Sequence, residues 1–300
     1  MMDRLRPRPL GEGFGRTVAP SERSAMEIPV TGFGMSQVGL GVRGESISVF
    51  FPAYNDAPSL PSLIEKTFDV LGRHFQDFEV IVVNDGSRDE TAAVLASLEH
   101  RFGPRLRVIT HEVNRGYGGA LRSGIGAATK DLVFYTDGDG QYDVGELPKL
   151  LALMQADVGL VNGYKIERND PWHRIWIGNV YNRFARFLFR VKIRDIDCDF
   201  RLIRRSLLDD IKLCSTSGTI CVELVRKLEM SPYRTEEVGV HHYPRLHGRS
   251  QFFRVRSLLT TLCQLLQLYI EVVILRRPRH RVHNRAGVAP SRPATPLRTS

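Results

Sequence analysis

Cysteine is scarce in this chain, which has four cysteines among its 300 residues. They form no C-x-x-C pair and no histidine pattern completes a zinc site, so neither a zinc-binding domain nor a disulfide framework is indicated. The chain also lacks a charged and then apolar start that ends in a small-residue cleavage site, so we expect no secretory signal. No repeated period is present. A reducing compartment, such as the cytoplasm, fits these absences.

The excess of basic residues lies at the two ends of the chain. The formal net charge is +9. Residues 276–300 contain seven arginines and no acidic residue, and residues 1–44 contain six basic and four acidic residues, which leaves the part between them balanced. Residues 1–44 are rich in Pro, Gly, Arg and Ser, and we expect both ends to be disordered tails. The basic C-terminal tail suits an anionic membrane surface, and nucleic acid is the weaker alternative.

Short apolar runs alternate with helical patterns after Ser46. The 42% apolar content is enough for a sizeable core. Strand and helix signals at this spacing predict an α/β fold with a parallel sheet and right-handed crossovers. Further along the chain, after residue 200, we expect a helix around Glu223 and a strand from Glu237 to Tyr243. The first five strands are expected in ISVFFPAYN, FEVIVVNDGS, LRVITHE, LVFYTDGDGQYD and VGLVNGYK.

The strongest candidate site is the stretch from Leu132 to Asp143, where an apolar run ends in aspartate and glycine residues. Ligands of an open α/β sheet bind beyond the carboxyl ends of the strands, so Asp137 and Asp139 are expected to face a substrate. With the Gln141 carbonyl and Asp143 nearby, they form a set of hard oxygen ligands suited to Mg²⁺ or Mn²⁺. For this segment alone, an ordinary acidic turn is the alternative.

Three other strand ends carry polar residues that would converge on the same edge of a parallel sheet: Pro52 to Asp56, Asn84 to Ser87 and Asn114 to Gly116. With these motifs, the chain resembles the family 2 GT-A glycosyltransferases, and specifically the polyprenyl (dolichyl) phosphate sugar transferases, from about Ser46 to Phe252. The resemblance implies a GT-A fold, which has a Rossmann-like, mainly parallel sheet flanked by helices. Residues 116–119 lack the Lys-Ser/Thr pair of a Walker A loop, and we expect close backbone packing there. The implied nucleotide-binding residues are Pro52, Tyr54, Asp56, Asp85, Asn114, Gly116 and Asp137.

The D-x-D element of that family matches Asp137-Gly138-Asp139. The resemblance implies that Asp139 binds the cation directly, that Asp137 binds the ribose or a metal-bound water, and that Gln141 assists the metal. A divalent cation would neutralise the charge that develops on the departing β-phosphate.

The acceptor side is expected later in the chain, where Asp195 to Arg201 resembles D-x-x-x-G-F-R and RLHGRS, at 245–250, resembles R-x-x-G-x-S. Arg201 and Arg245 would bind the phosphate of a lipid acceptor, with structural ion pairs as the alternative. A phosphate monoester is largely dianionic near neutral pH and needs no strong base. A hydroxyl acceptor would need one, from Asp195, Asp197, Asp199 or Glu223. The departures from the family pattern are Asn84 for Asp, Asp199 for Gly and Gln251 for Lys.

Two helices with basic residues are candidates for membrane contact. Residues 172–191 place apolar residues and arginines on different sides, which is typical of an interfacial helix or of a helix packed on the domain. Residues 258–275 would extend about 27 Å, which is marginal for a bilayer core. A polar stripe of Thr260, Gln264, Gln267 and Glu271 favours a helix in the membrane interface over a core-packed helix, an oligomer contact or a span.

We therefore expect four parts: a disordered tail (1–44), a GT-A domain (45–251), an amphipathic interfacial helix (252–275) and a basic tail (276–300). The expected activity is metal-dependent, inverting transfer of a hexose from a nucleoside-diphosphate sugar, GDP-mannose or UDP-glucose, to polyprenyl or dolichyl phosphate. The enzyme would sit peripherally on the cytoplasmic face of the membrane. One alternative is a glycosyltransferase with a hydroxyl acceptor. Another is a non-catalytic protein that binds nucleotides or nucleic acid.

Overall fold

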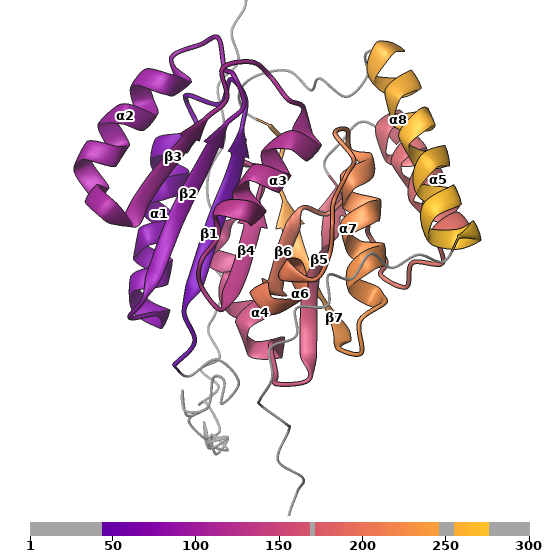
Figure 1. Ribbon diagram of the computed structural model, residues 1–300. Coiled ribbons are helices and arrows are strands. Elements are labelled where there is room, and N and C mark those ends of the chain that lie inside the picture. The colour runs from indigo at the N-terminus through magenta and orange to yellow at the C-terminus, as the bar shows by residue number, and fades with distance from the viewer. Residues whose placement is uncertain (1–43, 169–171, 246–254, 276–300) are drawn as a thin grey trace, which may run out of the picture. The chain divides into compact units, whose positions relative to one another are not determined.

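The computed structural model describes residues 44–168, 172–245 and 255–275 (Figure 1). Nearly all of the two expected tails and residues 246–251, which include most of the second acceptor motif, lie outside this range.

A seven-stranded sheet forms the centre of the described domain, in the strand order β3-β2-β1-β4-β6-β5-β7. The pairs β1–β2, β1–β4, β2–β3 and β5–β7 are parallel. The expected mainly parallel α/β sheet is therefore confirmed. The strands are β1 (Ile47–Ala53), β2 (Phe78–Asn84), β3 (Leu106–Thr110), β4 (Leu132–Thr136), β5 (Val158–Arg168), β6 (Phe200–Arg204) and β7 (Arg234–His242).

Strand β6 departs from the expected parallel arrangement because it runs antiparallel to both of its neighbours, β4 and β5. Its first residue, Phe200, pairs with Thr136, the last residue of β4. The chain therefore enters β6 at the edge where β4 ends. This reversal brings Asp199 and Arg201 to the same edge as the acidic residues that follow β4.

Helices cover both faces of the sheet (Figure 1). Successive strand residues face opposite sides, so Val49 and Phe51 join one core while Phe50 joins the other. A sheet buried on both faces explains the nearly continuous apolar runs in its strands. The first core contains α1 (Leu60–His74), α2 (Thr91–Phe102) and α4 (Leu147–Leu153), and the second contains α3 (Tyr117–Ala127), α5 (Trp172–Phe189), α6 (Arg205–Asp209), α7 (Thr219–Glu229) and α8 (Val255–Tyr269).

Helix α8 and the π-helical turn that follows it (Ile270–Ile274) pack against the domain through part of the predicted polar stripe. The Gln264 Oε1 accepts hydrogen bonds from the backbone N–H groups of Thr216 and Ser217, both at 3.1 Å, and Glu271 lies 3.5 Å from Lys227 Nζ. Gln264 and Glu271 of this stripe therefore contact the protein. In the described part of the chain, no helix has both the length and the apolar character to cross a bilayer.

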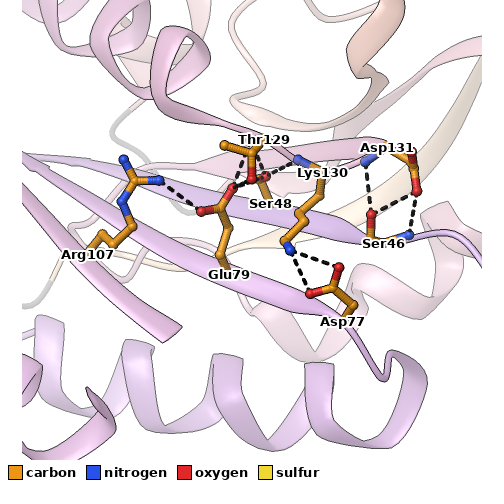
Figure 2. A network of polar contacts seen from close by, with 8 residues as sticks. All are labelled: Ser46, Ser48, Asp77, Glu79, Arg107, Thr129, Lys130 and Asp131. Carbon is orange, nitrogen blue, oxygen red and sulfur yellow. Dashed lines mark hydrogen bonds and ion pairs between the residues drawn. The ribbon is translucent and has the colours of Figure 1, made fainter. Parts of the chain in front are cut away.

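A polar network lies at the amino ends of β1, β2 and β4, around the buried carboxylate of Glu79 (Figure 2). One oxygen accepts from the Ser48 hydroxyl at 2.7 Å and from the Thr129 backbone N–H at 2.8 Å. The other accepts from Arg107 at 3.0 Å. Burial alone would raise the pKa of Glu79, but the hydrogen bonds from Ser48, Thr129 and Arg107 outweigh it and lower the pKa below its ordinary value.

We predict that Glu79→Ala lowers the free energy of unfolding by about 3 kcal/mol, because several buried donors lose their acceptor. The contribution is present at neutral pH and is lost as the pH falls below the ordinary glutamate pKa and through the lowered folded-state pKa. Urea unfolding of wild type and variant at several pH values measures this. Asp77→Ala is the control, because its ion pair with Lys130 is exposed and contributes about 0.5 kcal/mol. Equal losses in the two variants would contradict the prediction.

Candidate active site

The two aspartates of the D-x-D element lie immediately after β4, at the carboxyl edge of the sheet. Between them, the Gly138 N–H donates to the Pro52 carbonyl at 3.0 Å, so the turn is tied to the end of β1. A Cβ at Gly138 would come within 2.9 Å of that oxygen. A residue without a side chain is therefore needed for this close approach.

Asp137 lies among other carboxylates. Its Oδ1 accepts from the Tyr117 hydroxyl at 2.8 Å. Burial, together with the negative charges of Asp199 and Asp139, raises the pKa of Asp137 well above its ordinary value. Burial likewise raises the pKa of Asp56 to about 6; the Tyr54 backbone N–H partly opposes this shift and the charge of Asp139 adds to it. The carboxylates at this edge of the sheet therefore carry more negative charge than the neighbouring basic groups and hydrogen-bond donors neutralise.

Asp139 carries an arginine partner. Its Oδ1 accepts from the Gln141 N–H at 3.0 Å, and its Oδ2 pairs with the Arg245 guanidinium. The Gln141 side chain donates to the Tyr243 carbonyl at 3.0 Å and faces Arg245. Gln141 thus ties the acidic loop to the segment after β7, and its metal-assisting role remains a prediction.

The donor set at this edge fits a divalent cation. Asp137 and Asp139 offer hard oxygen ligands of the kind that Mg²⁺ and Mn²⁺ prefer. A positive charge there would oppose the burial and the carboxylate repulsion that together raise the pKa values of Asp137 and Asp56. Within the described ranges, three or more His, Cys, Asp or Glu residues never gather in a metal-binding arrangement. Water molecules and phosphate oxygens of a bound donor would supply the remaining ligands of such a cation.

The predicted nucleotide-binding loops after β1, β2 and β3 meet at the same edge. The Asp85 N–H donates to the Ala53 carbonyl at 2.9 Å, and the Asn55 N–H donates to the Ser87 hydroxyl at 3.0 Å. Gly86 has a φ of +67°, and a Cβ there would lie 2.7 Å from the Asn114 nitrogen. Gly86 is thus required for two reasons: its φ is positive, and a side chain would collide with the backbone at Asn114.

Asn84 stands where the family pattern has an aspartate, and its contacts in the structure explain this replacement. Asn84 is 1% exposed, and its Oδ1 accepts from the Ser87 N–H at 3.1 Å. An amide oxygen accepts this bond as a carboxylate would, and it does so without burying another negative charge.

The glycine-rich segment packs closely against another loop, as predicted. A Cβ at Gly118 would lie 2.3 Å from the Ser215 carbonyl oxygen, and one at Gly116 would lie 2.7 Å from that of Thr216. The same loop is held by Gln264 of α8. The segment that carries Tyr117, the partner of Asp137, therefore rests on a loop fixed by the C-terminal helix.

Arg201 lies inside the protein, which corrects the expectation that it faces an acceptor phosphate. The residue is 0% exposed. Its guanidinium donates to Asn162 at 2.7 Å and to Asp199 at 2.6 Å, and it also contacts the Tyr135 hydroxyl and the Ile196 carbonyl. The structural ion pair, which was the alternative, is the arrangement found. Asp199, which replaces the usual glycine, supplies the counter-charge.

Glu223 is also held by the protein. It is 1% exposed and accepts from the Cys214 and Ser215 N–H groups at 2.9 and 2.8 Å and from Lys227 at 2.7 Å. It therefore positions the loop that begins at Cys214. Burial raises the pKa of Asp197 to about 6.

Two residues of the site were missed in the sequence: Tyr117, which contacts Asp137, and His111, which contacts Asp85. His111 directly follows β3, so a rule that collects polar residues at strand ends would have included it. Tyr117 is the first residue of α3, and only its contact with Asp137 in the structure identifies it as a residue of the site.

The chain is similar in sequence to known proteins. A model described as "Glycosyl transferase family 2" matches residues 48–212. The chain is 31% identical over 213 residues to undecaprenyl-phosphate 4-deoxy-4-formamido-L-arabinose transferase of Pseudomonas fluorescens, covering 70% of this chain and 61% of that protein. It is 29% identical over 210 residues to the Enterobacter sp. protein of the same name, covering 70% of this chain and 63% of that protein. The chain thus spans less than two thirds of each of these relatives.

The fold also matches solved structures. Glucosyl-3-phosphoglycerate synthase from Mycobacterium tuberculosis in complex with UDP aligns with a TM-score of 0.56 at 19% identity, over 77% of this chain and 80% of that chain. The same synthase with Mn²⁺, UDP and phosphoglyceric acid aligns with a TM-score of 0.53 at 18% identity, over 77% and 79%.

The sheet order and its flanking helices are those of a GT-A glycosyltransferase. Because the family model matches more than half of the sequence, the chain belongs to glycosyl transferase family 2.

Proposed function

We propose that this protein is a metal-dependent, inverting glycosyltransferase that transfers a hexose from a nucleoside-diphosphate sugar to a polyprenyl or dolichyl phosphate. One observation carries this proposal: the ends of β1, β2 and β4 bring Asp56, Asp85, Asp137 and Asp139 to one edge of a GT-A sheet. The named activity of the relatives from Pseudomonas and Enterobacter supports a lipid phosphate as the acceptor.

In this proposal, each part of the edge has one task. Asp85 accepts the ring N–H of the nucleobase, and Tyr54 covers the base. Asp137 and Asp139 hold Mg²⁺ or Mn²⁺, which when bound neutralises the β-phosphate charge. The acceptor oxygen attacks the anomeric carbon from the side opposite the nucleoside diphosphate, whose bond to the sugar breaks, so the configuration inverts.

The acceptor phosphate is assigned to Arg245 in this proposal. Its side chain is partly exposed and already contacts Asp139 at the acidic edge. Arg201 acts as a positioning residue, because it is buried and fixes Asp199 close to Asp137. A dianionic phosphate is itself a sufficient nucleophile, so the transfer needs no buried base.

Membrane contact is supported by the surfaces of α5 and α8, which lie side by side and touch through Phe189 and Tyr269 (Figure 1). Much of the predicted apolar face of α5 points away from the core, since Phe184 is 56% exposed and Phe187 is 84% exposed. Arg183 on the same helix is also exposed. Exposed aromatic and basic side chains on one helix suit the headgroup region of an anionic membrane on its cytoplasmic face. The corresponding exposed residues are Leu266 of α8 and, in the π-helical turn that follows it (Ile270–Ile274), Ile270 and Ile274.

We predict that Phe184→Ser combined with Phe187→Ser lowers binding to vesicles rich in phosphatidylglycerol by about tenfold or more, because two large apolar groups no longer enter the interface. Co-sedimentation measures the bound fraction. Val113→Ser is the matched control: Val113 is 68% exposed but lies in the loop after β3. Unchanged binding of the double variant would remove α5 from the membrane contact.

The proposed activity is tested with labelled sugar nucleotides, among them GDP-mannose and UDP-glucose. Each is incubated with the full chain and undecaprenyl phosphate, with and without Mn²⁺, and the products are partitioned between water and organic solvent. We expect Mn²⁺-dependent label in the organic phase. Label transferred only to a hydroxyl acceptor in water would replace the lipid acceptor, and no transfer from any donor would overturn the proposal.

A further inference from the structure

His111 lies between the carboxylate of Asp85, which is predicted to bind the base, and helix α3. It directly follows β3 and is 3% exposed. Its Nδ1 lies 2.6 Å from Asp85 Oδ1, and its Nε2 lies 2.9 Å from the hydroxyl of Ser123 on α3. The His111 N–H also donates to the Asn84 carbonyl at 2.9 Å, which fixes the backbone of His111 against β2.

In the neutral form of the ring, these contacts fix which nitrogen carries the proton. An ionised carboxylate can only accept hydrogen bonds, so Nδ1 must be the donor to Asp85. Nε2 is then an acceptor, and the Ser123 hydroxyl donates to it. The imidazole is thereby fixed in one tautomer and one orientation.

The carboxylate of Asp85 is oriented in turn. Its Oδ1 accepts from His111 and also from the Arg115 backbone N–H at 2.8 Å. Both bonds fall on the same oxygen, and among the described residues no donor reaches Oδ2. Asp85 is 3% exposed, so its rotamer is set by these two donors.

We propose that His111 is a positioning residue for nucleobase selection, which holds Asp85 so that Oδ2 accepts the ring N–H of the base. This inference rests on the proposed function, in which Asp85 binds the donor nucleotide. Uracil and guanine carry such an N–H, whereas cytosine and adenine present a ring nitrogen that can only accept. A fixed carboxylate facing that nitrogen leaves two acceptors opposed and unpaired, and sites of this kind discriminate strongly.

The test measures the affinities of UDP, CDP, GDP and ADP by calorimetry, with the full chain and Mg²⁺. Wild type is expected to bind UDP about tenfold or more tightly than CDP, or GDP about tenfold or more tightly than ADP, or to show both preferences. In His111→Gln, the amide nitrogen takes the place of Nε2 and the donor to Asp85 is lost, so this preference should fall to about threefold or less. In His111→Asn, the amide nitrogen takes the place of Nδ1, and most of the preference should remain. Equal preference in His111→Gln and wild type would overturn the inference.

Two further variants separate the possible failures. Asp85→Asn can donate to an acceptor nitrogen, so it should relax or reverse the preference. If it changes nothing, Asp85 does not bind the base and the donor assignment in the proposed function fails. Ser123→Ala keeps the contact between His111 and Asp85, and its selectivity should stay close to that of wild type.

A measurement on wild type needs no variant. Nitrogen-15 NMR of the His111 ring is expected to show the proton on Nδ1 and to shift when the favoured nucleotide is added. A ring protonated only on Nε2, or one that does not respond to that nucleotide, would overturn the inference.

Discussion

Asp139→Asn is expected to reduce turnover about a thousandfold while the protein stays folded. The carboxylate is proposed to hold a cation that stabilises the leaving phosphate, and a contribution of several kcal/mol to the transition state corresponds to this factor. An amide keeps the shape of the side chain, and its oxygen can still accept from the Gln141 N–H. The measurements are the turnover number at saturating donor and Mn²⁺, the Mn²⁺ affinity, and the melting temperature.

Asp143→Asn is the matched control for this experiment. Asp143 belongs to the same acidic loop, but its carboxylate pairs with Lys66 at 2.6 Å and accepts from the Gly145 N–H at 2.7 Å. It is therefore committed to the loop and should retain most of the activity. A similar loss of turnover in both variants, or full activity of Asp139→Asn, would show that the D-x-D element does not hold the cation.

Arg201→Ala is expected to lower the free energy of unfolding by about 4 kcal/mol, because it leaves the Asp199 carboxylate without its counter-charge near Asp137. Urea unfolding measures this loss. The double variant Asp199→Asn with Arg201→Met should recover part of it, since no unpaired charge is then left inside the protein.

Arg245→Ala provides the contrast. Its ion pair with Asp139 is partly exposed, so we expect a stability loss of about 1 kcal/mol or less. The Michaelis constant for the lipid phosphate should rise far more than the affinity for the donor falls. If Arg201→Ala instead kept its stability and showed the defect in acceptor use, Arg201 would be the phosphate ligand and its buried position would not describe the working enzyme.

The nucleotide side of the site could be predicted from local sequence. The runs before Asp85 and Asp137 are mostly apolar because their strands are buried on both faces, and they stop where polar and glycine residues begin. Parallel strands then place all these ends at one edge. The missing Lys-Ser/Thr pair of a Walker A loop also led to the correct expectation of close backbone packing at glycines 116 and 118.

The acceptor side could not be predicted in the same way, because it depends on contacts between distant segments. The direction of β6 is set by pairing with β4, and local sequence does not encode it. Arg201 looks like an exposed ligand in a motif, yet Asn162 and Tyr135 from two other strands enclose it. Gln264 likewise belongs to a regular polar stripe, and only its partners at Thr216 and Ser217 show that it faces the protein.

The central claim is that Asp137 and Asp139 hold the cation against the donor's pyrophosphate. A crystal structure of the full chain soaked with Mn²⁺ and a sugar nucleotide tests it most directly, with anomalous scattering to locate the manganese. The account predicts manganese within coordination distance of Asp139, in contact with the pyrophosphate, and the base beside Asp85. Manganese and pyrophosphate bound elsewhere, with the acidic edge empty, would contradict it.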